Sequence, residues 1–169
     1  MTYAVILSAA LVGLMSGCAT ASARVPVTPS TPPTFLGEVV GVHDGDSITV
    51  LARGIKEKIR LMGIDCPETD QPFGEAATLA TTRLALHQTV TVTNMGRDRY
   101  HRLLGEIVLS DQRILNHELV REGACWWYHV YAPHNTTLQA LETDARTLKR
   151  GLWADPAPTP PWEWRKQKK

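Results

Sequence analysis

The chain alternates short β-prone runs with turn residues over much of its length. Apolar and β-branched residues with two-residue alternation predict strands at residues 36–42, 47–52, 56–64, 89–93 and 103–109. The first two runs are separated by residues 43–46, His-Asp-Gly-Asp, and Asp-Gly between two such runs predicts a tight hairpin. In the third run Ile59 and Leu61 alternate with charged residues, so we expect Arg60 to leave the core side of its strand.

Helical spacing of apolar residues replaces this alternation in three other stretches. Residues 74–88 carry alanines and leucines at near-helical spacing, and residues 114–122 form a shorter run that is stopped by Gly123. Asn135 is a good N-cap for a last helix that ends at Gly151. The order of three strands, a helix, two strands and two helices indicates an α+β fold, in which a small curled sheet closes into a barrel and helices cover its open ends.

The N-terminal residues are expected to be separate from this fold. Residues 4–15 form an apolar run that is shorter than the roughly 20 residues of a transmembrane helix but has the length of a signal-peptide core. Residues 15–18, Met-Ser-Gly-Cys, resemble a bacterial lipobox, in which Cys18 would receive lipid. We therefore expect an exported protein, either lipid-anchored in the bacterial cell envelope or secreted. The expected parts are a signal peptide (1–18), a Pro/Thr/Ser-rich linker (19–34), a folded domain (35–155) and a Pro/Trp-rich basic extension (156–169).

Composition and net charge exclude few classes of function or partner for this protein. The chain has 169 residues, 43% of them hydrophobic, and 18 Lys and Arg against 17 Asp and Glu give a net charge of +1. Near-neutrality does not exclude a nucleic-acid partner, because a local basic patch is sufficient. After lipidation of Cys18, Cys66 and Cys125 are either a disulfide pair or two separate buried thiols. The stretch at 162–166 either docks on the barrel, or its basic tail contacts nucleic acid or lipid headgroups.

Carboxylates and arginines gather in three short segments. These are Asp46 in the hairpin turn, residues 60–68 (Arg-Leu-Met-Gly-Ile-Asp-Cys-Pro-Glu) and residues 98–102 (Asp-Arg-Tyr-His-Arg). Paired carboxylates hold a hard divalent cation, a further carboxylate acts on a water molecule, and arginines grip phosphate oxygens as a fork. Phosphodiester hydrolysis requires this set of groups, because charge grows on the phosphate oxygens in the transition state.

These segments, with residues 116–123 and 151–153, follow the order typical of the staphylococcal nuclease family, and the chain resembles that family over residues 36–154. The resemblance implies an OB-type five-stranded β-barrel with three helices. It also implies a Ca²⁺-dependent endonuclease that hydrolyses phosphodiester bonds in DNA and RNA by in-line attack of an activated water. We expect this nuclease domain to act as a monomer.

The resemblance assigns metal binding and water activation to four residues. Carried over by position, Asp46 and Asp65 would bind Ca²⁺ through their side chains, and Cys66 would add its main-chain carbonyl oxygen. Glu68 would activate or orient the attacking water. Asp44 is left out of this set, because a role in the turn explains it adequately.

Five further residues are implied as phosphate and nucleotide contacts. Arg60 and Arg102 would act as catalytic residues that grip the reacting phosphate. Arg99 and Tyr100 would contact a terminal phosphate of the bound nucleotide, and Tyr131 would line the nucleotide pocket. These assignments rest on the positions that the residues share with the family.

Three residues depart from the family pattern. Cys66 stands where Thr is common, and metal binding is expected to survive because only its main-chain carbonyl is needed. His101 stands where Gly is usual, between Tyr100 and Arg102, and we expect it to narrow or recharge the phosphate site. His129 stands where Tyr is common, which affects nucleotide preference rather than the reaction.

Two other functions use the same barrel. The first is a non-catalytic nucleic-acid-binding OB-type module, and the second is a lipid-anchored envelope protein whose barrel mediates contacts. The intact carboxylates and arginines of the three segments argue against the first function, and the second predicts neither metal dependence nor nucleic-acid affinity.

Overall fold

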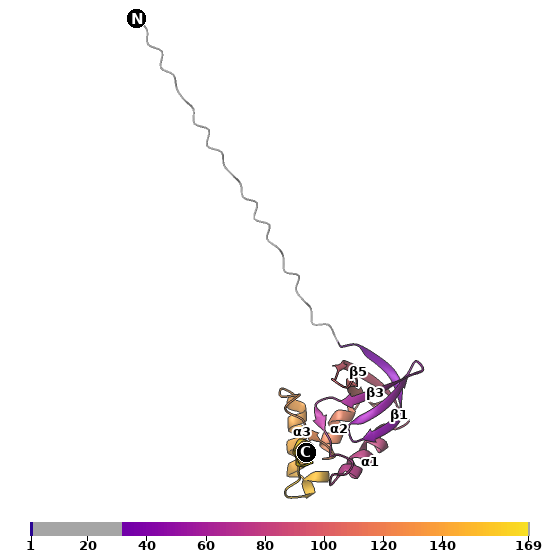
Figure 1. Ribbon diagram of the computed structural model, residues 1–169, viewed down its shortest axis with the longest axis vertical. Coiled ribbons are helices and arrows are strands. Elements are labelled where there is room, and N and C mark those ends of the chain that lie inside the picture. Colours follow the sequence, from indigo (N-terminus) through magenta and orange to yellow (C-terminus); the bar gives the residue numbers. More distant parts are fainter. Residues whose placement is uncertain (2–31, 169) are drawn as a thin grey trace. The chain divides into compact units, whose positions relative to one another are not determined.

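The computed structural model describes residue 1 and residues 32–168, and every element below lies in one compact unit, residues 31–169. Residues 2–31, with the predicted signal peptide, the Cys18 lipobox and most of the linker, lie outside the described residues. The strands are β1 (Thr34–Asp44), β2 (Ser47–Ala52), β3 (Ile55–Leu61), β4 (Ile64–Asp65), β5 (Thr89–Arg97), β6 (Leu103–Val108) and β7 (Trp126–Trp127). The helices are α1 (Gly74–Ala85), α2 (Leu115–Arg121), α3 (Thr136–Thr147), the short 3₁₀ helix η1 (Gly151–Ala154) and α4 (Pro161–Gln167) (Figure 1).

Five strands close into a barrel in the order β1-β2-β3-β6-β5, and β5 pairs back onto β1. Pairing is antiparallel except between β3 and β6, which run parallel. Alternate residues of these strands point into the barrel and form its apolar core. They include Ile48, Val50, Ile59, Val92 and Ile107, all fully buried. The predicted α+β barrel of five strands is confirmed.

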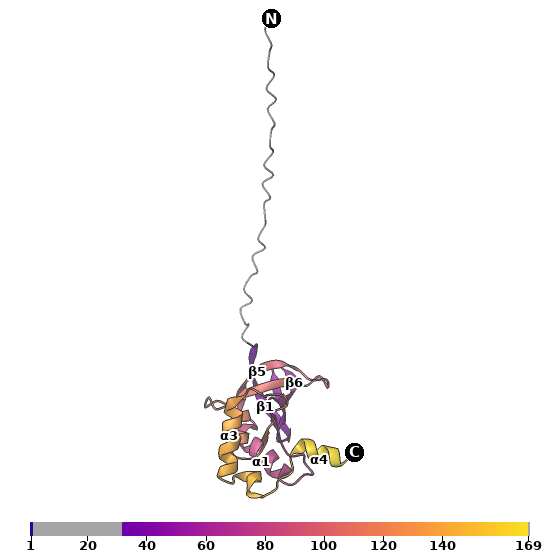
Figure 2. The ribbon, with the colours of Figure 1, turned by 90° about the vertical axis from the view of Figure 1, so that its left-hand side faces the viewer.

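Helices α1, α2 and α3 are the three predicted helices, and they lie together at one end of the barrel (Figures 1 and 2). The predicted end signals are present: the Asn135 side chain accepts a hydrogen bond from the amide of Leu138 at 3.0 Å, and Gly123 follows α2 with a φ of 69°. The sequence did not predict α4, which begins with Pro161 in its first turn. None of the helices in the described part of the chain is long and apolar enough to span a membrane.

The predicted C-terminal boundary of the third strand, residues 56–64, is wrong, because β3 ends at Leu61. The chain leaves the barrel at a turn through Met62 and Gly63, whose φ is 79°, and β4 then pairs with β7 instead of a barrel strand. Asn116 holds this turn, because its side-chain nitrogen donates to the carbonyl oxygens of Met62 at 2.9 Å and Gly105 at 3.2 Å. The turn was not predicted because the apolar Met62 continues the strand-like pattern of the sequence. This turn directs β4 away from the barrel sheet.

Strands β1 and β5 are longer than predicted. They pair from Thr34 opposite Thr93 to Glu38 opposite Thr89, and β5 continues to Arg97 as the partner of β6. Thr34 therefore begins a strand although it falls in the predicted linker. The lengths of β1 and β5 are therefore set by the strands with which they pair, rather than by the alternation of apolar residues in their own sequences.

Cys66 and Cys125 form a disulfide, which decides between the two interpretations of this pair. Cys66 follows β4 directly and Cys125 directly precedes β7, and both residues are buried. The bond therefore fastens the start of the loop that leads to Glu68 to the chain that enters β7.

Candidate active site

Asp46 lies in the tight turn between β1 and β2, and three hydrogen bonds fix this turn. The Asp44 carboxylate accepts from the amide of Asp46 at 3.0 Å, which confirms the turn role of Asp44. The Thr81 hydroxyl of α1 donates to the carbonyl of Gly45 at 2.6 Å, and the Leu61 amide of β3 donates to the carbonyl of Asp46 at 2.8 Å. The backbone of Asp46 is thus held by a helix and a strand from other parts of the chain.

The side chain of Asp46 is buried among charges. It is 6% exposed, its Oδ2 accepts a hydrogen bond from the Cys66 amide at 2.7 Å, and Nη1 of Arg60 lies 3.0 Å from the same oxygen. Burial raises the pKa of Asp46 from 3.8 to about 7, and the charges of Asp44 and Asp65 add to this rise. Arg60 and the Cys66 amide oppose it without cancelling it. The cost of burying the Asp46 carboxylate therefore exceeds the stabilisation that Arg60 and the Cys66 amide give to its ionised form.

Arg60 brings the two predicted metal-binding carboxylates together. Its Nη2 donates to Oδ1 of Asp65 at 2.8 Å, while Nη1 lies 3.0 Å from Oδ2 of Asp46. The same Nη1 donates to the carbonyl oxygens of Leu61 at 2.9 Å and Ile64 at 3.0 Å, so the guanidinium also holds the turn between β3 and β4. Arg60 leaves the core side of its strand as predicted, with the neighbours on either side buried. Its binding of phosphate stays a prediction.

Glu68 combines a fixed backbone with a partly exposed carboxylate. Its amide donates to the side-chain oxygen of Gln71 at 3.1 Å, and its carbonyl accepts from the Gln71 amide at 2.9 Å. Gly74 at the start of α1 approaches this carbonyl so closely that an added Cβ would lie 1.9 Å from it. The Glu68 side chain is 38% exposed. It is therefore positioned at the open side of the carboxylate cluster, where a water can reach it.

Arg165 of α4 enters the site. Nothing in the sequence predicts this contact beyond a basic residue in a Trp-rich stretch. Its Nη1 donates to Oε1 of Glu68 at 2.7 Å, and its Nη2 donates to Oδ2 of Asp65 at 2.7 Å. Burial lowers the pKa of Arg165, but the hydrogen bonds and charges of Asp65 and Glu68 outweigh this and raise it. The 162–166 stretch thus docks on the folded unit, one of the two outcomes left open by the sequence.

Arg102 lies on the loop that precedes β6, held by Asp98. The Asp98 carboxylate accepts from the Arg102 amide at 2.9 Å, from Nε of Arg102 at 2.8 Å and from the Tyr100 amide at 2.8 Å. Burial alone would raise the pKa of Asp98, but these hydrogen bonds lower it. Arg60 of β3 pairs with Leu104 of β6. Arg102 comes two residues before Leu104, so its side chain is expected on the same face of the barrel as Leu104 and Arg60. Within the described residues, no ion pair joins Arg102 to the carboxylate cluster.

The three predicted nucleotide contacts lie on exposed loops. Tyr100 is 63% exposed and lies beneath the guanidinium of Arg99, with Cζ 4.8 Å from the ring centroid. Tyr131 follows β7, is 71% exposed and packs against Tyr128 with ring centroids 4.9 Å apart. The structure therefore brings Asp46, Asp65, Glu68 and Arg60 together, and it places these three residues outside that cluster. Their nucleotide contacts remain predictions.

His101 adopts a left-handed backbone conformation, with a φ of 64°. Glycine accepts this conformation without a steric penalty, which explains why Gly suits the position. The His101 residue is exposed, so its first effect is on the backbone of the loop rather than on the interior of the site.

The donor set fits a hard divalent cation. Asp46 and Asp65 offer carboxylate oxygens, and Cys66 follows with a main-chain carbonyl, which are the ligands that Ca²⁺ takes together with water. Within residues 32–168, no three His, Cys, Asp or Glu side chains cluster as a metal site.

The barrel, the buried acidic pair and the arginine between them define a small OB-type barrel protein with an acid–arginine site. The family model described as "Staphylococcal nuclease homologue" matches residues 58–155. An "Uncharacterized endonuclease" of Escherichia coli O157:H7 is 45% identical over 134 residues, which cover 78% of this chain and 86% of the relative. A "Micrococcal nuclease" of Shigella flexneri is 38% identical over 144 residues, 80% of this chain and 83% of the relative. The chain belongs to the staphylococcal nuclease family, as the sequence predicted.

Proposed function

We propose that this protein is a Ca²⁺-dependent endonuclease that hydrolyses phosphodiester bonds in DNA and RNA. The observation that carries the proposal is the meeting of Asp46 and Asp65 at the guanidinium of Arg60, with Glu68 at the open side of the pair. These residues come from a hairpin turn, a short strand and a loop, so the fold assembles them for a purpose other than barrel stability. Membership of the nuclease family supports the same activity.

Each group of the site has a distinct part in this reaction. Asp46, Asp65 and the carbonyl of Cys66 would hold Ca²⁺, which supplies positive charge to the phosphate when it is bound. Glu68 takes a proton from the water whose oxygen attacks phosphorus in line with the leaving oxygen. Arg60 donates to the phosphate oxygens on which negative charge grows in the transition state.

Arg102 completes this charge stabilisation from the neighbouring strand. Its side chain is partly exposed and contacts Asp98 through Nε, and its guanidinium carbon lies 5.6 Å from the centroid of the Tyr100 ring. A fork-shaped donor binds phosphate oxygens in pairs. Arg99 and Tyr100 on the same loop would contact a terminal phosphate, and Tyr131 would line the nucleotide pocket.

Cleavage assays test the proposal directly. The purified protein is incubated with supercoiled plasmid, single-stranded DNA and RNA in Ca²⁺ or in chelator. We expect nicked and linear plasmid, and short products from all three substrates, in Ca²⁺ only. Binding of the same substrates without cleavage would instead support the non-catalytic OB-type module, and cleavage unaffected by chelator would contradict the metal requirement.

The proposal includes the location of the enzyme. The apolar run at residues 4–15 and the lipobox-like residues 15–18 support export with lipid attached at Cys18. Fractionation of bacteria that express the full-length chain tests this, with Cys18→Ser as the control. Membrane association of the parent and its loss in the variant are expected, whereas equal distribution of both would contradict the lipid anchor. A monomer in solution is expected for the folded unit.

A further inference from the structure

Both oxygens of the Asp65 carboxylate are bonded to arginines. Oδ1 accepts from Arg60 at 2.8 Å and from Nη1 of Arg165 at 3.2 Å, while Oδ2 accepts from Nη2 of Arg165 at 2.7 Å. Nη1 of Arg165 also reaches Oε1 of Glu68 at 2.7 Å. One guanidinium from the C-terminal helix therefore holds a predicted metal ligand and the predicted catalytic base at the same time.

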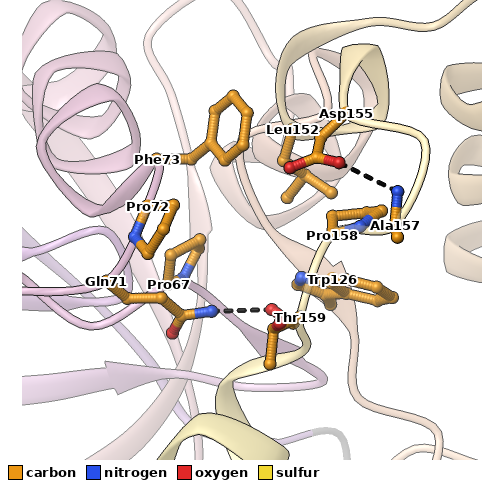
Figure 3. A pocket seen from close by; sticks show the side chains of 10 residues that line it. All are labelled: Pro67, Gln71, Pro72, Phe73, Trp126, Leu152, Asp155, Ala157, Pro158 and Thr159. Carbon is orange, nitrogen blue, oxygen red and sulfur yellow. Dashed lines mark hydrogen bonds between the residues drawn. The ribbon is translucent and has the colours of Figure 1, made fainter.

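The segment that delivers Arg165 is docked by specific contacts. The ring of Trp162 stacks on Tyr128, with centroids 5.2 Å apart and planes 9° from parallel, and meets Trp126 edge-on at 5.6 Å. Upstream of α4, the side-chain nitrogen of Gln71 donates to the carbonyl of Thr159 at 2.7 Å (Figure 3). Figure 3 also shows residues 157–159 facing residues 71–73 across a small pocket. The position of Arg165 follows from this docking.

The neighbouring basic residues make different contacts. Lys166 is exposed and pairs with Glu163 of its own helix at 2.9 Å, and Lys168 pairs with Asp70. Arg165 alone among these three reaches Asp65 and Glu68. The contact is therefore a property of this one side chain rather than of a generally basic tail.

A bound divalent cation and the Arg165 guanidinium would both need the carboxylate oxygens of Asp65. Calcium–oxygen bonds of roughly 2.3–2.6 Å need the carboxylate oxygens to face the ion. Arg165 already donates to both oxygens, and two cations held this closely repel each other. The same guanidinium also occupies Oε1 of Glu68, so this oxygen is bonded to Arg165 rather than free to accept from a water molecule.

We propose that α4 is an autoinhibitory latch, in which Arg165 competes with the divalent cation for Asp65 and restrains Glu68, so that metal binding and release of Arg165 are coupled. The proposal rests on the proposed Ca²⁺ site and adds a residue that lies beyond the segment matched by the family model, residues 58–155. Metal alone drives the release, and no substrate is required. The docked aromatic residues set how readily the latch opens.

Calorimetric titration of the protein with Ca²⁺ alone tests this coupling. Arg165→Gln is expected to raise the Ca²⁺ affinity about 10-fold, within the usual range of coupling between two sites. Lys166→Gln removes the same charge from the same helix and is expected to leave the affinity within about 2-fold of the parent, because a charge that is exposed to solvent acts weakly. Hydrogen exchange of residues 161–167 is expected to become faster in the parent when Ca²⁺ is added.

The other outcomes are separable. Equal affinity of the parent and Arg165→Gln, or slower exchange of α4 in Ca²⁺, would overturn the latch while leaving the nuclease proposal intact. A lower turnover of Arg165→Gln with unchanged Ca²⁺ affinity would make Arg165 a positioning residue for Glu68 instead. Failure of the parent and both variants to bind Ca²⁺ would overturn the metal site and the latch together. If thermal melting shows that Arg165→Gln does not fold, Arg165→Lys, which keeps the charge but loses the fork, is expected to raise the affinity by a smaller factor.

Discussion

The backbone amide of Cys66 donates a 2.7 Å hydrogen bond to Oδ2 of Asp46. This bond joins the loop after β4 to the hairpin turn between β1 and β2, and the disulfide to Cys125 anchors the same residue from the other side. The acidic pair of the site is thus held by a covalent bond as well as by packing.

Removal of the disulfide is expected to destabilise the protein. A crosslink that closes 59 residues of chain restricts the unfolded state and stabilises the fold by up to about 4 kcal/mol. Urea unfolding with and without reductant measures the change in the free energy of unfolding. The double variant Cys66→Ser/Cys125→Ser should be insensitive to reductant, and an unchanged midpoint for the reduced parent would show that the bond does not constrain the fold.

His101→Gly is expected to stabilise the protein by up to about 1 kcal/mol, because His101 holds a φ of 64° that glycine adopts without strain. Thermal melting measures the effect. Arg99 in the same loop has no positive φ, so Arg99→Gly is the matched control and is expected to destabilise. A lower melting temperature for His101→Gly would mean that the imidazole makes a stabilising contact in solution.

Calcium affinity is expected to depend on pH through Asp46, whose pKa is raised to about 7 by burial. The metal binds the ionised carboxylate, so affinity should rise about 10-fold per pH unit below this value and level off above it. Stability should change in the opposite sense: between about pH 4 and pH 7 the folded state keeps a proton that the unfolded state has lost, so the contribution of Asp46 to stability falls as pH rises. Calorimetry across this range measures the affinity, and Asp46→Asn should remove its pH dependence. A flat profile for the parent would contradict the assigned pKa.

Arg60 and Arg102 are expected to differ in their effects on stability but not in their effects on turnover. Substitution of either by Ala should lower turnover by about 10²-fold, as for other preorganised charge stabilisers. Arg60→Ala should also destabilise by about 3 kcal/mol, because it leaves the buried Asp46 without its ion-pair partner. Arg102→Ala removes a partly exposed pair and should change stability by less than about 1 kcal/mol. Comparison of melting and turnover for the two variants separates support of the fold from catalysis.

The sequence predicted those features of the fold that depend on neighbouring residues. Alternation identifies the barrel strands, and Asn135 and Gly123 mark helix ends through their own backbone preferences. The break after β3 escaped prediction because Met62 continues the apolar pattern, and the turn depends on the distant Asn116.

The candidate site likewise contains residues that the sequence predicted and one, Arg165, that it did not. Asp46, Asp65 and Glu68 could be placed together from the family resemblance, and the structure joins Asp46 to Asp65 through Arg60 and Asp65 to Glu68 through Arg165. Arg165 could not be predicted, because α4 is a seven-residue helix whose position depends on tertiary contacts rather than on a local pattern. The disulfide likewise required knowledge of where two distant segments meet.

The most direct test of the central claim is the single-turnover rate of DNA cleavage by the parent and by Glu68→Gln at saturating Ca²⁺. We expect a fall of about 10²-fold or more, because the amide cannot accept the proton of the attacking water. Arg113→Ala, which removes an exposed arginine that pairs with Asp111 and Glu118 outside the site, should cleave at the parent rate. Equal rates for the parent and Glu68→Gln would contradict the assignment of this site as the catalytic centre.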